Sequence, residues 1–406
     1  MPARVTAGEK ARSVSRSQAP QGERRWGLDK FLDDEPRRNQ RVGWLANGAA
    51  VTHGELVWGP LAALARGFQV VQLFGPEHGP HGAIKAGQRV EDHHDPWTGL
   101  PVCSLYSSAP AKLGEALARC DTVVVDMVDL AARYSTNLAL VADMLEAVAG
   151  LGRHQRFVVL DRPNVLGRAV EGPRLSPEIR SIVGRLDVPV RHGLTTGEVA
   201  RWYSRSAGLA VDLEVVCFAG YDMGEVAALD RPFLSPSPNI NGMEAQLLYP
   251  GTCLAEGTNL SEGRGTAFPF QVVGAPWLDA RAIADELRRD QWEGVAPRPV
   301  RFVPSTSKHE GEVCEGVFLH VVEPDRVRPV ALAVRLLSLV FARHEEAAVL
   351  PAGTGRQLRF IDLLWGAADL GDCLEGRWQP PRAEAPAGFA DEVVPDLLYE
   401  HPLTAF

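Results

Sequence analysis

The chain has 406 residues, of which 45% are hydrophobic, and its formal net charge at pH 7 is −9. This length allows a sizeable buried core, in two domains or in one large domain. The negative charge, and the lack of a long basic run after the first thirty residues, argue against a partner nucleic acid. No apolar run reaches the roughly eighteen residues that a membrane span requires, so we also expect no membrane partner.

The six cysteines are scattered without a C-x-x-C motif, and several lie in apolar stretches. This distribution favours reduced, buried thiols over a disulfide framework or a zinc knuckle. The segment from Met1 to Arg25 is polar and basic and contains no apolar stretch of the secretory type. We therefore expect residues 1–30 to be a disordered lead-in and the protein to be cytoplasmic.

From about residue 41, short β-rich runs alternate with helical segments. In the helical segment Thr136–Ala149, apolar residues recur every three to four positions, as they do on a helix face that packs against a sheet. This alternation predicts an α/β fold with a mostly parallel sheet and helices on both faces. The expected strands are Val42–Ala46, Phe68–Phe74, Val102–Tyr106, Thr122–Asp126, Phe157–Leu160 and Leu213–Phe218, and the other expected helices are Glu55–Arg66, Ala111–Arg119 and Gly197–Ser206.

The segment Leu234–Arg264 is rich in Pro, Gly and Asn and ends this alternation. Beyond it we expect a helix at Ala280–Arg289, a strand at Val313–Val322 and an apolar helix at Val330–Arg343. These elements predict a catalytic domain over residues 31–260 and a smaller α+β domain over 261–406, with a cleft between them.

Two acidic clusters follow apolar strands directly. Glu77 comes after the strand at Phe68–Phe74, and Asp161 and Glu171 come after the strand at Phe157–Leu160. Because ligands of open α/β sheets bind beyond the carboxyl ends of the strands, both clusters should lie on one rim, and two carboxylates there suggest acid/base chemistry. Each residue also has a structural interpretation: Glu77 as an exposed loop carboxylate, Glu171 as a turn residue, and Asp161 as a brace for Arg162.

Other reaction classes have weaker support. His78, His81, His93 and His94, with Asp92 and Asp95, crowd one loop and could hold a divalent metal, but their spacing matches no metal signature. A solvated polar loop fits better, so we expect no metal. The sequence also lacks the glycine-rich phosphate and dinucleotide motifs and the G-x-S-x-G elbow, and we expect no cofactor.

A series of motifs, in order from about residue 40 to 370, resembles one family closely: the NamZ-type exo-β-N-acetylmuramidases, long catalogued as a domain of unknown function. The matching runs include LFGPEHG (73–79), LDRPN (160–164), VEGP (170–173), RHGLT (191–195), PSPN (236–239), YPGTC (249–253) and EGTNLSEGRGT (256–266). The resemblance implies a Rossmann-like domain joined to an auxiliary domain, with the active site in the cleft between them. It also implies release of N-acetylmuramic acid from the non-reducing end of peptidoglycan fragments, so that muramyl sugars or muropeptides are the expected partners.

Glycoside hydrolysis commonly uses a proton donor and a second carboxylate as base or nucleophile. On the family's motifs, we expect Glu77 and Glu171 to fill these catalytic roles. The substrate's lactyl carboxylate needs a cation, for which the order of candidates is Arg162, Arg264 and Arg133. The full set of expected substrate-binding residues is His78, Asp126, Asp129, Arg133, Asp161, Arg162, Asn164, Asn259, Glu262 and Arg264.

One stretch, residues 126–137, departs from the family pattern. Val128, Ser135 and Asn137 replace a glutamine and two tyrosines that family members typically carry. A contact to the sugar could therefore be altered, which keeps open an alternative: a muropeptide-binding protein with altered catalysis.

Overall fold

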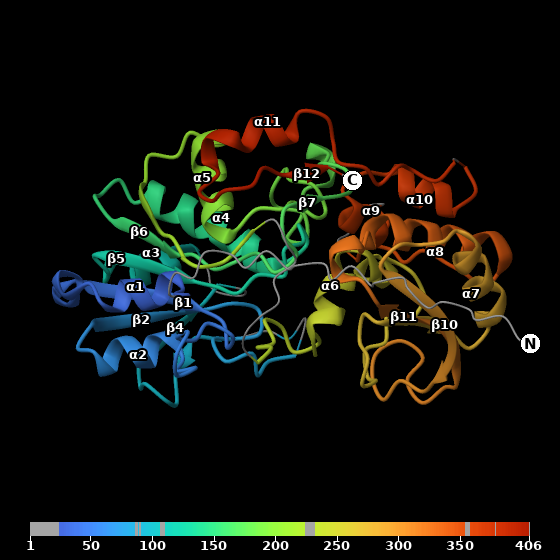
Figure 1. The fold of residues 1–406 in the computed structure, drawn as a ribbon. Helices are drawn as coiled ribbons and strands as arrows, with labels where there is room; N and C mark the ends of the chain where they lie inside the picture. The colour runs from blue at the N-terminus through green and yellow to red at the C-terminus, as the bar shows by residue number, and fades with distance from the viewer. Residues whose placement is uncertain are drawn as a thin grey trace, which may run out of the picture.

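The computed structural model describes residues 24–85, 88, 91–105, 110–223, 232–353, 358–377 and 379–405. Two lobes follow one another along the chain, coloured blue to green and yellow to orange in Figure 1. Figure 1 also shows the last, red part of the chain lying along both lobes.

A seven-stranded sheet forms the centre of the first lobe, in the order β3-β4-β2-β1-β5-β6-β8. Its neighbouring strands are parallel except β3 and β4, which are antiparallel, so the predicted α/β class is confirmed. The predicted strand at Val102–Tyr106 ends at Ser104 in the structure, and Tyr106 lies outside the described residues. The strands are β1 Arg41–Ala46, β2 Gln69–Gly75, β3 His93–His94, β4 Pro101–Ser104, β5 Thr122–Asp126, β6 Arg156–Leu160 and β8 Asp212–Val216.

Helices cover both faces of this sheet because successive side chains of a buried strand point to opposite sides. Trp44 and Val124 pack against α1 and α2 on one face. Leu45 and Val125 pack against α3, α4 and α5 on the other. The helices are α1 Gly27–Leu32, α2 Gly59–Ala65, α3 Pro110–Ala118, α4 Thr136–Gly150 and α5 Thr196–Ser206.

The second lobe packs helices on one face of a three-stranded antiparallel sheet, ordered β10-β11-β9. Val317 and Leu319 of the central strand point into the core beneath α7 and α8. The predicted helix at Val330–Arg343 is confirmed and begins one residue earlier, at Pro329, since proline is favoured in a first helical turn. The elements are α6 Met243–Thr252, β9 Val272–Ala275, α7 Ala280–Arg289, β10 Val295–Phe302, β11 Cys314–Val321, α8 Pro329–Arg343, α9 Phe360–Trp365 and α10 Asp369–Leu374.

The C-terminal segment returns to the first lobe. Strand β12 (Thr404–Ala405) pairs in parallel with β7 (Ala169–Val170), and α11 (Phe389–Val393) packs into the same core as α5. Figure 1 shows α11 above the green helices of the first lobe and β12 next to β7. The predicted second domain, 261–406, thus includes a tail that packs on the first lobe, whereas the boundary at 260/261 stays a prediction. Short 3₁₀ turns complete the fold at Glu35–Asn39, Pro177–Ile179, Cys253–Gly257, Pro324–Arg326 and Val394–Asp396.

The predicted lead-in, residues 1–30, falls mostly outside the described residues. Its described end, from residue 24 onward, packs on the sheet: Trp26 is 7% exposed and Leu28 is fully buried. In the part of the chain that the structure describes, no helix is both long and apolar enough to cross a membrane.

Candidate active site

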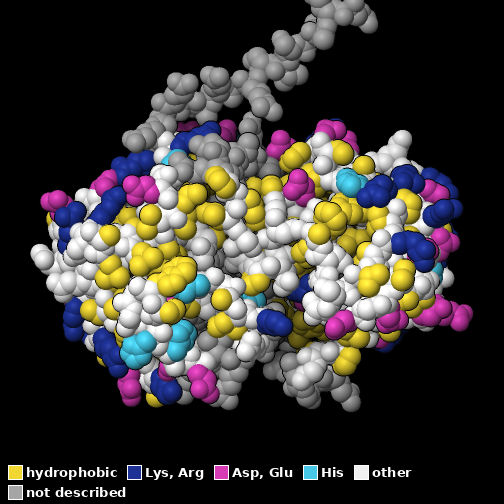
Figure 2. Space-filling view, turned by 90° about the horizontal axis from the view of Figure 1, so that it is seen from below, with side chains coloured by type: hydrophobic (Ala, Val, Ile, Leu, Met, Phe, Trp, Pro, Cys, Tyr) yellow, Lys and Arg dark blue, Asp and Glu magenta, His cyan; other side chains and the backbone are white. Residues whose placement is uncertain are grey.

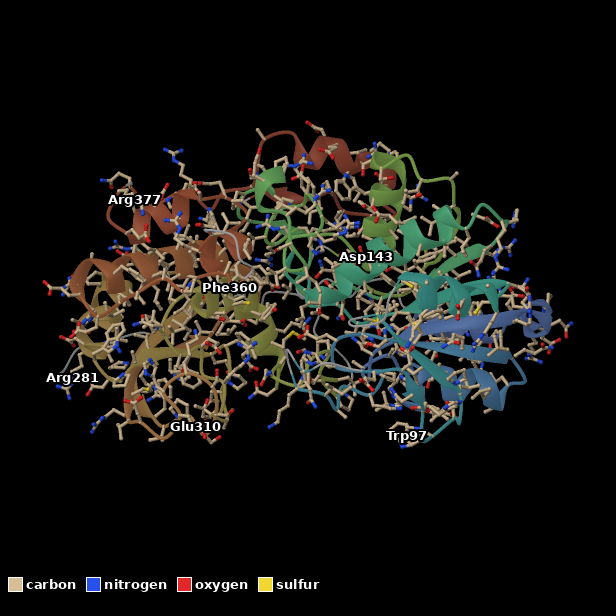
Figure 3. All side chains as sticks on the ribbon, turned by 180° about the vertical axis from the view of Figure 1, so that it is seen from behind. Trp97, Asp143, Arg281, Glu310, Phe360 and Arg377 are labelled. Atoms are coloured by element: carbon tan, nitrogen blue, oxygen red, sulfur yellow. The ribbon has the colours of Figure 1, made fainter. Side chains whose placement is uncertain are left out.

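A cavity of about 200 Å³ lies between the two lobes, at the carboxyl end of β2. We call it the interlobe cavity. Phe360, one of its lining residues, lies where the lobes meet (Figure 3). The first lobe contributes Glu77, His78, Leu130, Tyr134, Ser135, Thr136 and Asn137, and later segments contribute Val183, Pro236, Ser237, Asn239, Tyr249, Cys253, Glu256, Arg264, Phe270, Phe360 and Leu364.

Glu77 is a partly exposed carboxylate in the wall of this cavity. It follows β2 directly, and the Thr136 hydroxyl donates to its Oε2 over 3.2 Å. Thr136 is the first residue of α4, so Glu77 lies at the amino end of that helix, where the helix dipole favours a negative charge. The carboxyl ends of β2 and β5, which lie on either side of β1 in the sheet, thus bring Glu77 and the start of α4 together, as expected at this edge of a parallel sheet.

His78, beside Glu77, also lines the cavity, and its hydrogen bonds fix the orientation of its ring. Nδ1 donates to the Ile84 carbonyl oxygen over 2.8 Å. Nε2 lies 3.4 Å from the Ser237 hydroxyl, which donates to it when the imidazole is neutral. The ring therefore links the first lobe to the segment that leads into the second.

Arg264 brings positive charge to the opposite side of the interlobe cavity. Its guanidinium lies 2.8 Å from Glu256 and 2.7 Å from Glu262, and over the ring of Phe270 at 4.9 Å. Burial opposes its charge, but the two carboxylates outweigh burial and raise the pKa of Arg264 above its usual value. Within the described lining, Glu77 and Glu256 are the two carboxylates that face this cavity, one from each lobe.

The loop between β5 and α4 carries two expected binding residues behind the cavity wall. Asp129 accepts from the Ala131 amide and the Ser135 hydroxyl, both at 2.6 Å, and burial raises its pKa to about 6. Arg133 is 2% exposed, and burial lowers its pKa to about 10. It donates to four carbonyl oxygens, those of Pro173, Val188, Leu364 and Trp365, and so joins the two lobes. Asp129 and Arg133 therefore brace the cavity wall.

Two of the three positions that depart from the family pattern, Ser135 and Asn137, line the interlobe cavity. Asn137 also donates to the Val128 carbonyl oxygen over 3.2 Å, and Val128 is the third such position. The unusual stretch is thus next to Glu77.

Glu171, expected as the second catalytic carboxylate, lies away from this cavity and is fully buried. Its Oε1 accepts from Arg191 over 3.0 Å, and its Oε2 accepts from the amides of Val330 and Ala331, at the start of α8, over 3.2 and 3.4 Å. Burial raises the pKa of Glu171, and the Arg191 guanidinium opposes that rise. With these partners Glu171 ties the first lobe to α8.

The remaining expected binding residues lie in structural networks. Arg162 pairs with Asp126 at 2.7 Å and donates to the Val51 carbonyl, and it lines a separate, smaller pocket beside Trp26. The Asn164 side chain accepts from the Leu166 amide and donates to the Leu194 carbonyl oxygen. The Asn259 side chain donates to the Glu346 carbonyl oxygen and accepts from the Ala348 amide. Glu262 is 1% exposed and pairs with Arg264 and Lys308.

Asp161 is a buried cap for α5. The Thr195 and Tyr399 hydroxyls donate to it over 2.7 Å each, and the Gly197 amide donates over 2.9 Å. Burial raises its pKa to about 6.

This raised pKa predicts an effect on stability. The native state binds the Asp161 proton more tightly than the unfolded chain does, so the stabilisation is present below pH 4 and is lost as the pH rises through 6. The difference from the unfolded pKa of about 3.9 corresponds to at most roughly 3 kcal/mol. Asp161→Asn should flatten the pH dependence of the unfolding free energy by up to this amount, measured by urea titration at pH 4.5 and 7. Asp143→Asn, at an exposed site on α4, is the control, and equal slopes in both variants would contradict the assignment.

In the histidine-rich loop, His81 contacts a carboxylate and two aromatic rings. His81 Nε2 lies 2.5 Å from Asp95, and its ring contacts Trp58 and Trp97 at centroid distances of 4.4 and 4.0 Å. Histidine side chains gather on this face of the first lobe (Figure 2). Among the described residues, no three side chains of the ligating types come together to hold a metal ion.

Comparison with known proteins decides the family. Residues 42–244 match the N-terminal model of the exo-β-N-acetylmuramidase NamZ, and residues 247–387 match its C-terminal model. The chain belongs to the NamZ exo-β-N-acetylmuramidase family. It is therefore a glycoside hydrolase of the muramidase type, as the sequence motifs predicted.

Individual relatives agree with this assignment. The peptidoglycan β-N-acetylmuramidase NamZ of Bacillus subtilis is 34% identical over 324 residues, which cover 79% of this chain and 78% of that protein. Two crystal structures of DUF1343 family proteins from Bacteroides fragilis are 25% and 26% identical, with TM-scores of 0.78 and 0.71. Each alignment covers 93% of this chain and 99% of the other, so the similarity includes both lobes.

The sequence motifs pointed to Glu77, His78 and Arg264, which line the cavity, but several other lining residues were not singled out. Tyr249, Cys253 and Glu256 lie inside the quoted runs 249–253 and 256–266, so the motifs could have drawn attention to them. Phe360 lies outside the quoted motifs, and its place in the cavity depends on how α9 folds back onto the first lobe.

Proposed function

We propose that this muramidase releases N-acetylmuramic acid from the non-reducing end of peptidoglycan fragments, with the interlobe cavity as its active site. The observation that carries the proposal is that Glu77, which follows β2, faces a polar cavity walled by both lobes. Its volume of about 200 Å³ suits a single sugar better than several, as removal of a terminal sugar requires.

Two carboxylates facing one cavity can divide the chemistry of glycoside hydrolysis. We assign one role to Glu77 and the other to Glu256, which replaces Glu171 in our proposal because it faces the cavity from the second lobe. Glu256 is held by Arg264 at 2.8 Å and accepts from the Cys253 thiol at 3.3 Å, so its position is fixed before substrate binds. Asp129 would position Ser135 and the start of α4 without touching the sugar.

The assay that tests this function is hydrolysis of a chromogenic N-acetylmuramide by the purified protein. Release of the chromophore by the parent protein, and its loss in Glu77→Gln and Glu256→Gln, would support the proposal. Saturable binding of the sugar without hydrolysis would instead support the alternative of a sugar-binding protein with altered catalysis, for which the changes at Ser135 and Asn137 provide a structural reason.

Arg264 is our candidate for recognition of the lactyl carboxylate because it lines the interlobe cavity, whereas Arg162 lines a separate pocket. Its buried Nε has no hydrogen-bond partner among the described residues. Arg264→Ala should reduce the preference for N-acetylmuramic over N-acetylglucosamine glycosides by roughly 10- to 150-fold, the value of one charge-assisted hydrogen bond of about 1.5–3 kcal/mol.

The measured quantity is the ratio of kcat/KM for the two sugars on one preparation, because the fraction of folded enzyme cancels in it. Arg162→Ala is the control and should keep the parent ratio even if it lowers stability. A parent-like ratio in Arg264→Ala would remove Arg264 from this role.

A further inference from the structure

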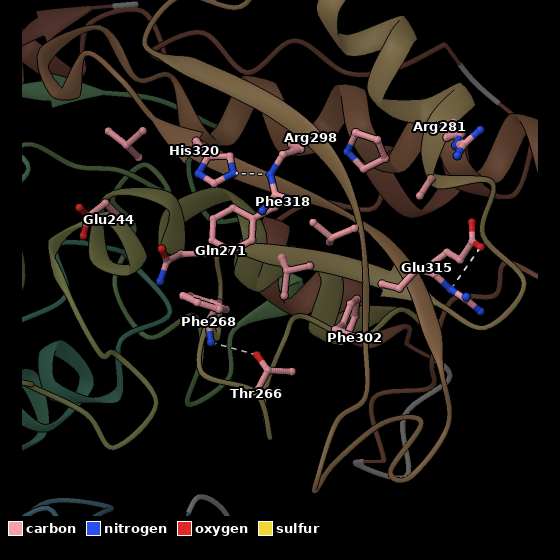
Figure 4. A pocket seen from close by; sticks show the side chains of 16 residues that line it. Glu244, Thr266, Phe268, Gln271, Arg281, Arg298, Phe302, Glu315, Phe318 and His320 are labelled. Atoms are coloured by element: carbon pink, nitrogen blue, oxygen red, sulfur yellow. Dashed lines mark hydrogen bonds and ion pairs between the residues drawn. The ribbon is translucent and has the colours of Figure 1, made fainter.

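A hollow of the second lobe lies along the β10-β11-β9 sheet and is bordered by the first residues of α7 (Figure 4). We call it the sheet groove. Its volume is about 850 Å³. Because side chains alternate along a strand, Val317 and Leu319 enter the core, whereas Phe318 and His320 of the same strand face the groove. Arg298 and Phe302 of β10 face it as well.

Three phenylalanine rings, Phe268, Phe302 and Phe318, line the sheet groove. The Phe302 ring lies over Gly274 and Gly316, where an added Cβ would approach its Cε1 to 2.8 Å. Phe318 stacks on His320 at 4.2 Å and meets the edge of Phe268 at 5.0 Å. Phe268 is 48% exposed, whereas Phe318 is 8% exposed. The exposed face of the Phe268 ring suits the C–H face of a sugar ring.

The sheet groove adjoins the interlobe cavity through the segment 264–271. Arg264 and Phe270 of this segment line the cavity, whereas Thr266, Phe268 and Gln271 line the groove. From there the groove runs to Arg281, which lies at the outer edge of the second lobe (Figure 3). A chain that leaves the cavity over this segment would enter the groove.

The groove also offers positive charge. Arg301 is the one lining arginine with a carboxylate partner among the described residues, Glu315 at 3.7 Å. Arg298 instead donates to His320 Nε2 over 2.9 Å, and Arg281 forms no ion pair within the described chain. Glu244, at the end nearest α6, is the second acidic residue of the lining. Arg298 and Arg281 are therefore available to an anionic ligand.

We propose that the sheet groove binds the part of the glycan that continues beyond the sugar to be released. Its occupant is a chain of alternating N-acetylated sugars, with a sugar face on Phe268 and the lactyl carboxylates near Arg298 and Arg281. The inference rests on the proposed function and extends it: the enzyme distinguishes a long glycan from a disaccharide by a site outside the catalytic cavity.

The test compares two substrates, a chromogenic N-acetylmuramide and a peptide-free glycan of several disaccharide units, on the double variant Phe268→Ala/Arg298→Ala. We expect KM for the glycan to rise on the order of tenfold or more, because the variant loses a charge-assisted contact to the glycan. We expect kcat for the glycan to stay within about twofold of the parent value. Turnover of the single sugar should stay within twofold, because its binding ends in the interlobe cavity.

Trp97→Ala and Arg289→Ala serve as matched controls, since both side chains are exposed, at 63% and 68%, and lie outside the groove. An unchanged glycan KM in the double variant would overturn the groove proposal. A third substrate, the same glycan with its stem peptides, tests the other occupant: an effect limited to it would also overturn the proposal, because the groove would then bind the stem peptide. Failure of the parent protein to hydrolyse the single sugar would instead count against the proposed function itself.

Discussion

Glu77→Gln is expected to abolish hydrolysis of an N-acetylmuramide while leaving the fold intact. The amide keeps the shape of the side chain, and it can still accept from Thr136, but it can neither exchange a proton nor attack as a carboxylate. General acid–base catalysis typically contributes about 10²–10⁴-fold, and loss of a nucleophile costs at least as much. The measurement is kcat on the chromogenic sugar, with the thermal unfolding midpoint recorded on the same sample.

Thr136→Val is a matched companion to this variant. It removes the hydroxyl that donates to Glu77 but keeps the carboxylate, so we expect a loss of about tenfold rather than abolition. If Glu77→Gln kept near-parent turnover, the interlobe cavity would lose its catalytic carboxylate from the first lobe, and the assignment of this site would fail.

The first lobe was predictable because its parallel strands are buried on both faces and therefore form short, continuous apolar runs. Strand β5, TVVVD, is fully buried along its length and was predicted at its observed bounds. The two-residue strand β3 was missed, since its histidines are exposed and two residues give no periodicity.

The second lobe was harder to predict, because the packing of segments far apart in the sequence decides where its helices and strands form. Strand β10 contains Pro297 and Pro299, which usually argue against a strand, and it exists because it lies at the sheet's edge, where a missing amide costs no ladder bond. Helix α6 includes Pro250 and Gly251. A Cβ at Gly251 would lie 1.8 Å from the Pro329 carbonyl oxygen, so the glycine serves close packing against α8, which no local pattern reveals.

The residues of the candidate site show the same difference between local sequence pattern and long-range packing. Motifs placed Glu77, His78 and Arg264 near substrate, and these side chains do line the cavity. The motifs could not separate them from Arg133 and Glu171, because local sequence does not reveal which polar side chains of a loop are buried by distant segments. What distinguishes the buried ones is their partners: Glu171 meets Arg191, twenty residues on, and the start of α8, 159 residues on.

Glu171→Gln is accordingly expected to lower stability strongly while the folded enzyme keeps its turnover. The variant leaves the Arg191 guanidinium, whose side chain is 4% exposed, without its carboxylate. Removing one partner of a buried pair typically costs about 3–5 kcal/mol. The loss of negative charge at the amino end of α8 adds to this, because the amides of Val330 and Ala331 then lose a charged acceptor. The measurements are the urea unfolding free energy and kcat at low temperature.

A double variant separates the structural role from the catalytic one. Replacing a buried pair by apolar side chains of similar volume is often close to neutral, so Glu171→Met/Arg191→Met should be more stable than Glu171→Met alone. Both should hydrolyse the chromogenic sugar at near-parent kcat per folded molecule, because neither residue lines the interlobe cavity as described. If Glu171→Gln instead kept parent stability and lost turnover, Glu171 would be the catalytic carboxylate that the motifs predicted, and the cavity would have to open toward it when substrate binds.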